Sequence, residues 1–376
     1  MRTRREVARA ETVGSLLRPA WLQAARRELA EGKTSPERVR ELEDAAVMYA
    51  IELQKSAGLD VVTDGEMRRS GWAVTTQTLS GFELRPGGPG LTWKGGEESR
   101  DPGVYPTTMY PTVVERISEL HDGAAEYRFL AEHAGVRTKY SLPAPSYHRR
   151  FWYPEHSSAA YATCEEFLEA VRDHERALIE RLVGLGCDYV QLDAPNYGTL
   201  CDPANRGTLE ARGHDLEAEL AFDAALDCSV FDGIDGADGT DGVTRAMHVC
   251  RGNAAGRWHS SGGYAAIARE LFPRLPLDVL LLEYDSDRAG GFEPLAHVRP
   301  ETVVVLGLIT TKSGVLEDER EVEARIAEAA EVRPLQGLAL SPQCGFASVA
   351  MGNPITPDQQ RAKLELVGRL ARRVWG

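Results

Sequence analysis

The stretch Arg245-Ala-Met-His-Val-Cys-Arg-Gly-Asn253 ends a short apolar run with a histidine and a cysteine two positions apart. On an extended strand, residues i and i+2 project from the same face. The imidazole of His248 and the sulfur of Cys250 are therefore expected side by side, with Gly252 and Asn253 turning the chain away. Both side chains are preferred zinc ligands. Taken alone the pair decides little, because a strand end with a buried thiol and a hydrogen-bonded histidine has the same pattern.

Two further apolar runs end in residues of the same chemical kind. Leu281-Leu-Glu-Tyr-Asp285 places Glu283 at the end of one run, and Ser341-Pro-Gln-Cys-Gly-Phe346 places Cys344 at the end of another. A catalytic zinc ion usually takes three protein ligands and keeps one position for substrate. Three strand ends that all carry soft or acidic ligands favour a metal site over the structural interpretation.

The whole chain alternates short apolar segments with helical patterns, which indicates βαβ units and a parallel sheet. The expected strands lie at residues 11–15, 59–66, 136–140, 186–193, 243–250, 277–283, 302–308 and 335–340. Eight such units predict an α/β fold of the (β/α)8 TIM barrel type. A doubly wound open sheet is the competing architecture, but no glycine-rich phosphate-binding fingerprint follows the first strand.

Several helices carry clear start and stop signals. Ser35 is a good N-cap with Pro36 after it, and Gly58 ends that helix. Thr163 and Thr356 are expected to cap two further helices. Other helical patterns cover residues 21–29, 209–225, 264–271 and 317–332.

Residues 82–134 break this rhythm with glycine- and proline-rich turns such as Arg85-Pro-Gly-Gly-Pro-Gly90. We expect one domain over residues 1–376, with 82–134 as an insertion after the second strand that forms a hairpin, a lid or an oligomer arm. The acidic tract at 232–242 lacks the glutamate of an EF-hand and is interpreted as a solvated loop.

Composition narrows the classes of function. The chain has 376 residues and a formal net charge of −14, which argues against nucleic-acid partners and anionic membrane surfaces. It has no run long enough for a membrane span and no signal-peptide core, so a cytoplasmic protein is expected. Its six cysteines are scattered, which disfavours a disulfide framework. Homo-oligomerisation is a further expectation.

Together these motifs resemble one known family. His248-Val-Cys250, Glu283 and Cys344-Gly345, in that order, are similar to the catalytic domain of cobalamin-independent methionine synthase. Val13-Gly-Ser15 and Gln191-Leu-Asp193 match it as well. The chain looks most like the short single-barrel relatives of that enzyme, and the resemblance covers nearly its whole length.

The resemblance implies a zinc-dependent transferase that acts on a small thiol. It implies that zinc is held by His248, Cys250, Glu283 and Cys344. It also implies that Ser15, with the amides near Gly14, and the acidic pair of Glu66 and Asp193 hold the amino-acid part of a thiol such as homocysteine. Barrel-mouth salt bridging is the alternative for the two acids.

The second substrate is less well defined by the sequence. A departing donor atom needs a proton, and His148, His156 and Asp285 are candidate acids. Trp152 offers a stacking face for a donor ring, although such an aromatic is often only packed. The chain also departs from the synthase: Ala194 replaces a second acid, and Thr310-Thr-Lys-Ser-Gly314 lacks the histidine proposed as proton donor.

The leading hypothesis is methyl transfer to homocysteine, forming methionine, from a methylfolate or a methyl-carrying protein. The alternative is a thiol alkyltransferase of the epoxyalkane–coenzyme M type, for which Arg18, Arg68 and Arg69 could bind a sulfonate. A third hypothesis is an interaction protein with a structural zinc. Structural zinc sites are usually closed sets of cysteine and histidine, which fits the carboxylate Glu283 poorly.

Overall fold

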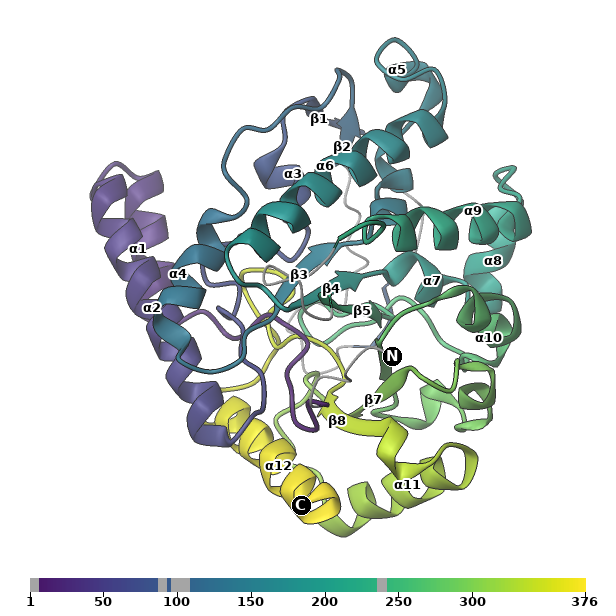
Figure 1. Cartoon of the computed structure of the whole chain (residues 1–376). Helices are drawn as coiled ribbons and strands as arrows, with labels where there is room; N and C mark the ends of the chain where they lie inside the picture. Colours follow the sequence, from purple (N-terminus) through teal and green to yellow (C-terminus); the bar gives the residue numbers. More distant parts are fainter. Residues whose placement is uncertain (1–6, 87–92, 96–108, 235–241) are drawn as a thin grey trace.

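The computed structural model describes residues 7–86, 93–95, 109–234 and 242–376. The fold is α/β, and its centre is a parallel sheet of six strands that follow one another in sequence order. Figure 1 shows these strands in the interior with helices around the outside. The six strands are β3 (Tyr140–Pro143), β4 (Tyr189–Asp193), β5 (Thr244–Val249), β6 (Val279–Glu283), β7 (Val303–Ile309) and β8 (Leu338–Pro342).

Twelve α-helices are assigned in the described residues. They are α1 (Ala20–Ala30), α2 (Pro36–Ala57), α3 (Thr75–Thr78), α4 (Ala125–Ala134), α5 (Pro154–Ser157), α6 (Cys164–Gly184), α7 (Pro195–Thr199), α8 (Pro203–Glu210), α9 (Leu216–Ser229), α10 (Ala265–Leu271), α11 (Glu319–Val332) and α12 (Pro357–Trp375).

The predicted N-caps are confirmed. The Ser35 side chain accepts from the Arg38 amide at the start of α2, and the Thr163 side chain accepts from the Glu166 amide at the start of α6. Thr356 forms a full capping box with Gln359 at the start of α12.

Two predicted boundaries were wrong. The helix expected over residues 209–225 is two helices, α8 and α9, because Gly213 takes a left-handed conformation with φ 90° and Asp215 caps a new start. The strand expected at 335–340 begins later, since residues Leu335–Gly337 form a 3-10 turn.

The first two predicted strands are not assigned as strands in the structure. The N-terminal segment touches β8 through an isolated parallel bridge between Ala10 and Leu340. The segment after α2 touches β3 through another, between Val62 and Thr138. The Asp60 amide also donates to the Ala10 carbonyl at 2.8 Å. These contacts line up along both edges of the sheet, but closure into the predicted (β/α)8 barrel stays a prediction.

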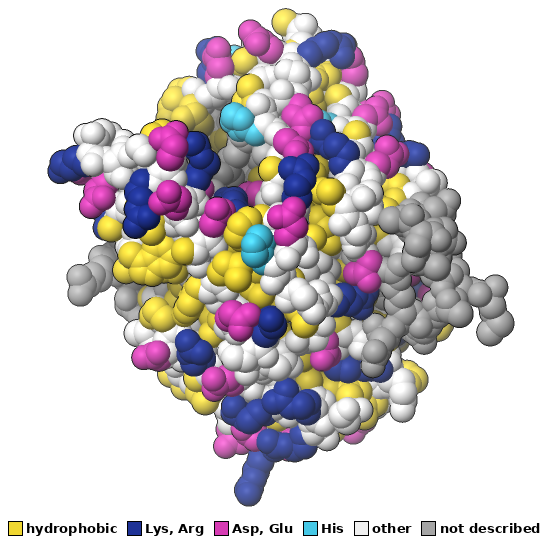
Figure 2. Space-filling model, turned by 60° about the vertical axis from the view of Figure 1, so that its left-hand side comes forward, with side chains coloured by type: hydrophobic (Ala, Val, Ile, Leu, Met, Phe, Trp, Pro, Cys, Tyr) yellow, Lys and Arg dark blue, Asp and Glu magenta, His cyan; other side chains and the backbone are white. Residues whose placement is uncertain are grey.

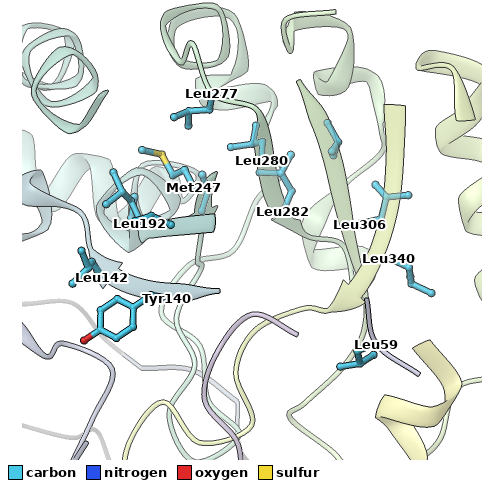
Figure 3. Close-up of a cluster of buried hydrophobic side chains, with 14 of the residues drawn as sticks. Leu59, Tyr140, Leu142, Leu192, Met247, Leu277, Leu280, Leu282, Leu306 and Leu340 are labelled. Carbon is cyan, nitrogen blue, oxygen red and sulfur yellow. The ribbon is translucent and has the colours of Figure 1, made fainter. Parts of the chain in front are cut away.

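The sheet is apolar on both faces. Leu192, Met247, Leu282 and Leu306 belong to the cluster between the sheet and the helices, part of which is drawn in Figure 3. Leu281 lies between Leu280 and Leu282 in sequence but belongs to a second cluster, because alternate residues of a strand face opposite sides. A sheet buried on both faces explains why its strands appear as continuous apolar runs.

The segment predicted as an insertion contains an antiparallel pair of strands, β1 (Phe82–Pro86) and β2 (Met109–Val113), followed by α4. Much of the connection between β1 and β2, at residues 87–92 and 96–108, lies outside the described residues. So does most of the acidic tract, at 235–241. That the chain is one domain with 82–134 inserted stays a prediction.

The surface carries both signs of charge. Figure 2 shows one face, on which Lys and Arg side chains are interspersed with Asp and Glu over much of the surface. In the part of the chain that is described, no helix combines the length and the apolar character needed to cross a bilayer.

A buried ion pair connects the N-terminal segment to the sheet. Lys139, directly before β3, donates to Glu11 Oε2 and to the Thr12 carbonyl, both at 2.6 Å, and to Gln191 Oε1 at 2.8 Å. Glu11 also accepts from the Tyr189 hydroxyl at 3.0 Å. Lys139 and Glu11 are each 1% exposed, so neither charge is stabilised by water.

We predict that Lys139→Met lowers the free energy of unfolding by about 3–5 kcal/mol, because Glu11 would stay buried without its cation. Lys55→Met, which removes a surface pair with Glu52, should cost less than about 1 kcal/mol. Urea denaturation measures both. Adding Glu11→Gln to Lys139→Met should recover part of the loss, whereas equal small effects for the two lysines would contradict the prediction.

Candidate metal centre

The ends of three strands bring four potential metal ligands together. His248 is the penultimate residue of strand β5 and Cys250 follows that strand, Glu283 ends β6, and Cys344 follows β8. The ligand atoms of these four side chains all lie within 4.8 Å of one another. Because the strands are parallel, their carboxyl ends meet at one edge of the sheet. Neighbours in space are thus supplied by residues nearly 100 positions apart.

The spacing of the two sulfurs matches a shared tetrahedral ion. Cys250 Sγ and Cys344 Sγ are 3.6 Å apart, and both cysteines are free thiols. Two sulfurs that each lie about 2.3 Å from one zinc ion at a tetrahedral angle would be separated by about 3.8 Å. The pair is thus already near the separation that a common metal ion requires.

The other two side chains offer atoms that have no hydrogen-bond partner in the described part of the chain. Both ring nitrogens of His248 and Oε2 of Glu283 are buried without a hydrogen-bond partner. Glu283 Oε1 is held by the Arg251 amide at 2.8 Å, which orients the carboxylate. Buried polar atoms are rarely left unpaired, so these orphaned atoms indicate that the cluster fits a metal ion.

The charges around the cluster also fit a metal ion. Lys312 lies 3.7 Å from Glu283 Oε2 and 3.5 Å from Asp285 Oδ2, and Arg288 contacts the same two carboxylates. If Cys250 and Cys344 are ionised, these cations compensate only the carboxylates. The remaining two negative charges equal the charge of one divalent cation.

Asp285, a predicted acid, is held in these ion pairs. Burial raises the pKa of its carboxyl, but Lys312 and Arg288 outweigh burial and hold that pKa below its ordinary value. An ionised Asp285 cannot donate a proton. In the structure its carboxylate pairs with Arg288 and Lys312, and an acid role for Asp285 stays a prediction.

A cavity of about 280 Å³ opens beside the cluster. Its wall includes His248, Cys250 and Cys344 and four of the predicted substrate-binding residues, namely Gly14, Ser15, Glu66 and Asp193. Trp152, the fifth, lines a different cavity, and its indole nitrogen donates to the Tyr161 carbonyl at 3.2 Å. The structure thus brings the acidic pair and the metal cluster into one cavity and leaves Trp152 out of it.

Glu66 is positioned by close contacts on several sides. Its Oε1 accepts from the Ser141 hydroxyl at 3.2 Å, and the guanidinium groups of Arg18 and Arg69 lie 4.0 and 3.9 Å from its carboxylate. A Cβ at Gly14 would lie 2.8 Å from Oε1, so only glycine leaves room for this carboxylate. Glu66 itself has φ 55°, a left-handed conformation that is rare for a residue with a side chain.

The second acid is buried at the end of β4. Gln191 donates to Asp193 Oδ1 at 2.7 Å. Burial raises the pKa of Asp193 to about 7, and burial raises the pKa of Glu66 as well. Two buried carboxyls with raised pKa values in one cavity are typical of a functional site.

Neither of the two predicted acid histidines is among the residues that line the described cavity. His148 lies in the 3-10 turn Pro145–Phe151, where its ring nitrogens contact Thr75 Oγ1 at 2.8 Å and the Pro145 carbonyl at 3.1 Å. Burial lowers its pKa to about 4. His156 is half-buried in the short helix α5. The turn directs His148 into the protein, and an acid role for either histidine stays a prediction.

No pattern in the sequence predicted the aromatic wall of the cavity. Trp72, Trp93, Tyr110 and Tyr147 line it, from four segments far apart in sequence. His259 lines it too, but burial, followed by the charge of Arg150, lowers its pKa to about 3, so it is neutral at pH 7.

Arg150 was missed as well. It lines both the metal-site cavity and a second cavity of about 530 Å³. The only signal was the aromatic and basic run His148-Arg-Arg-Phe-Trp-Tyr153, whose orientation the sequence does not define.

No protein-family model matches the chain. The uncharacterized protein YxjH from Bacillus subtilis (strain 168) is 37% identical over 375 residues, covering 98% of this chain and 94% of YxjH. A methionine synthase from Sulfurisphaera tokodaii is 28% identical over 243 residues, covering 64% of this chain and 60% of that protein.

A solved structure matches the whole fold. It is a putative vitamin-B12-independent methionine synthase from Listeria monocytogenes, with a TM-score of 0.72, 28% identity and 99% of both chains covered. The extent of the match to YxjH and this full-length structural likeness agree with the family predicted from the motifs. The chain therefore belongs to the family of short proteins related to cobalamin-independent methionine synthase.

Proposed function

We propose that this protein is a zinc-dependent methyltransferase whose acceptor is a small thiol, most of all homocysteine. The observation that carries the proposal is the shared cavity: a four-ligand cluster of thiols, imidazole and carboxylate stands beside a buried acidic pair. The similarity to a methionine synthase from Sulfurisphaera tokodaii and to a putative methionine synthase from Listeria monocytogenes supports methyl transfer.

The metal would be held by His248, Cys250, Glu283 and Cys344. A free thiol has a pKa of about 8.5 and is mostly protonated at pH 7. When bound, zinc would promote deprotonation of the acceptor thiol, so that its sulfur would be present as a nucleophilic thiolate. The protein's own contribution is to hold the acceptor and the donor in line.

The acidic pair suits the amino group of an amino-acid thiol. Glu66 and Asp193 are both buried. An ammonium group between them would exchange its hydrogen bonds to water for charge-assisted hydrogen bonds to the two carboxylates. Ser15 lies on the same wall, and a Cβ at Gly345 would overlap its hydroxyl oxygen, so this hydroxyl depends on a glycine neighbour. A sulfonate-bearing thiol would find carboxylates here, where it needs cations.

We also propose that the sheet closes as a (β/α)8 barrel, in which the segments around Ala10 and Val62 take the positions of the first two strands. Their bridges to β8 and β3, and the hydrogen bond from Asp60 to Ala10, support closure. Val13 and Val61 pack in the same apolar cluster as Leu281 and Val305 of the sheet. Closure would place Ser15 and Glu66 at the same rim as the metal ligands.

Anaerobic turnover tests the proposed reaction. Zinc-loaded protein is expected to convert homocysteine to methionine, read by mass spectrometry, with methyltetrahydrofolate or methylcobalamin as donor. If a fully zinc-loaded protein forms no methionine with either donor, the assignment of homocysteine as the acceptor is contradicted. Epoxide opening with coenzyme M would then test the alkyltransferase alternative.

Cys344→Ser is expected to lower zinc affinity at least tenfold and to abolish turnover, because it removes a thiolate ligand. Zinc content by mass spectrometry and folding by circular dichroism measure the two effects. Cys228→Ser, on α9 and outside the cavity wall, is the matched control and should keep both. Full activity without bound metal would refute a catalytic zinc, and unfolding on zinc removal would favour a structural one.

Glu66→Gln is expected to raise the KM for homocysteine by about tenfold with little change in kcat, because it weakens ground-state binding of an ammonium group. Steady-state kinetics at saturating donor measure the change, and zinc content should stay normal. Glu175→Gln is the control, since Glu175 is also a buried acid but lies on α6, outside the lining of the described cavity. An unchanged KM in Glu66→Gln would contradict the assignment.

A further inference from the structure

Arg150 stands at the wall between two cavities. It lies in the 3-10 turn Pro145–Phe151 that follows β3, and together with Tyr147 it lines both the metal-site cavity and the larger one behind it. The larger cavity, of about 530 Å³, is bounded by this turn, by α7 and by α8 and α9. A side chain in this position can contact a ligand that extends from the metal site.

No carboxylate in the described part of the chain balances the charge of Arg150. Within the described residues no carboxylate lies at ion-pairing distance from Arg150, and the groups that act most strongly on it are the hydroxyls of Tyr147, Tyr110 and Tyr153. Its Nε is buried and has no hydrogen-bond partner among those residues. A buried charge without a counter-ion is costly, so this arrangement fits a site whose counter-ion arrives with a ligand.

The neighbouring arginine shows the contrast. Arg149 also lines the larger cavity, but it donates to Asp223 at 2.6 Å and to Glu165 at 3.1 Å. The third acid on that wall, Glu219, is bonded to His214 at 3.0 Å. The acids of this cavity are therefore already paired, and the charge of Arg150 is left for a ligand.

The surroundings of Arg150 are aromatic. Its guanidinium lies 5.0 Å from the centre of the Tyr147 ring and 5.7 Å from that of Tyr110, and Trp72 packs on Tyr147 with ring centres 4.6 Å apart. Tyr147 and Cys250 line the same cavity. A ligand that reaches from the metal cluster to Arg150 must therefore cross an aromatic surface.

Arg150 is also separate from the acidic pair. The charges that act most on Glu66 are those of Arg69 and Arg18, and the charge that acts most on Asp193 is that of His248. The acceptor thiol, under the function proposed above, uses the acidic side of the cavity. The cation on the aromatic side is then available to the other substrate.

We propose that Arg150 binds an anionic group of the methyl donor, whose apolar or aromatic part lies against Tyr147 and Tyr110. This inference rests on the proposed function and names the chemical class of its second substrate. Arg150 selects donors that carry a carboxylate or a similar anion, and it leaves acceptor binding untouched.

The test uses binding and needs no turnover. The probes are 3-phenylpropanoate and its neutral analogue 3-phenylpropanamide, titrated into the zinc-loaded full chain while tryptophan fluorescence is followed. The wild type is expected to bind the anion about tenfold more tightly than the amide, as charge-assisted hydrogen bonds predict. Arg150→Gln should abolish this preference and Arg150→Lys should keep part of it.

Arg149→Gln is the matched control and should keep the full preference, because Arg149 is already paired. Persistence of the preference in Arg150→Gln, or its equal loss in Arg149→Gln, would overturn the proposal. Because Arg150→Lys keeps the charge and most of the length of the side chain, partial retention of the preference in this variant tests the proposal even if Arg150→Gln folds poorly.

A second titration at saturating homocysteine separates the donor from the acceptor. The anionic probe is expected to bind with unchanged affinity, since the two ligands use different sides of the cavity. Displacement of the probe by homocysteine would assign Arg150 to the acceptor and overturn the donor assignment. Failure of methionine formation would instead reject the proposed reaction, and this binding test would still report on Arg150.

Discussion

The parallel alignment of neighbouring strands is the constraint on which the candidate site depends. Between two parallel strands the chain must cross back to the end of the sheet where the first strand began. Every strand of the sheet therefore has its carboxyl end on the same side. Residues that follow β5, β6 and β8 therefore meet, although Cys250 and Cys344 are far apart in the chain. The helices that make these returns bury one face of the sheet, and the N-terminal segments contribute side chains to the cluster on the other.

Because the cluster of candidate metal ligands is largely buried, the groups packed around it determine its balance of charge. Glu283 is completely buried, and its two oxygens have different surroundings: one accepts from the Arg251 amide, while the other faces Lys312 and Arg288. Lys312 occupies the segment in which the full-length synthase has a histidine. In this chain the segment places the Lys312 ammonium group 3.7 Å from Oε2 of Glu283, one of the four candidate metal ligands.

The same cavity separates two kinds of recognition. Carboxylates stand on one side, at Glu66 and Asp193, and rings with a single cation stand on the other, at Tyr147 and Arg150. A cavity divided in this way favours ligands of different charge on its two sides, because each ligand is repelled by the wall that suits the other. Part of the aromatic wall comes from the segment that interrupts the βα rhythm, through Trp93 and Tyr110.

The sequence by itself predicted the helix caps, six of the strands and the four side chains of the candidate metal cluster, because the signal for each of them is local. Ser35, Thr163 and Thr356 cap helices through contacts within one turn, and the His-x-Cys spacing follows from the two-residue period of a strand. The family followed from motifs that each lie at the end of one apolar run.

Only the tertiary structure decided which side chains share the cavity. His148 and Trp152 lie in the same basic and aromatic run as Arg150, yet the turn directs His148 toward Thr75 and Trp152 toward Tyr161, while Arg150 reaches the cavity. The direction of a side chain in a 3-10 turn depends on packing against distant elements. No spacing within the sequence encodes that packing.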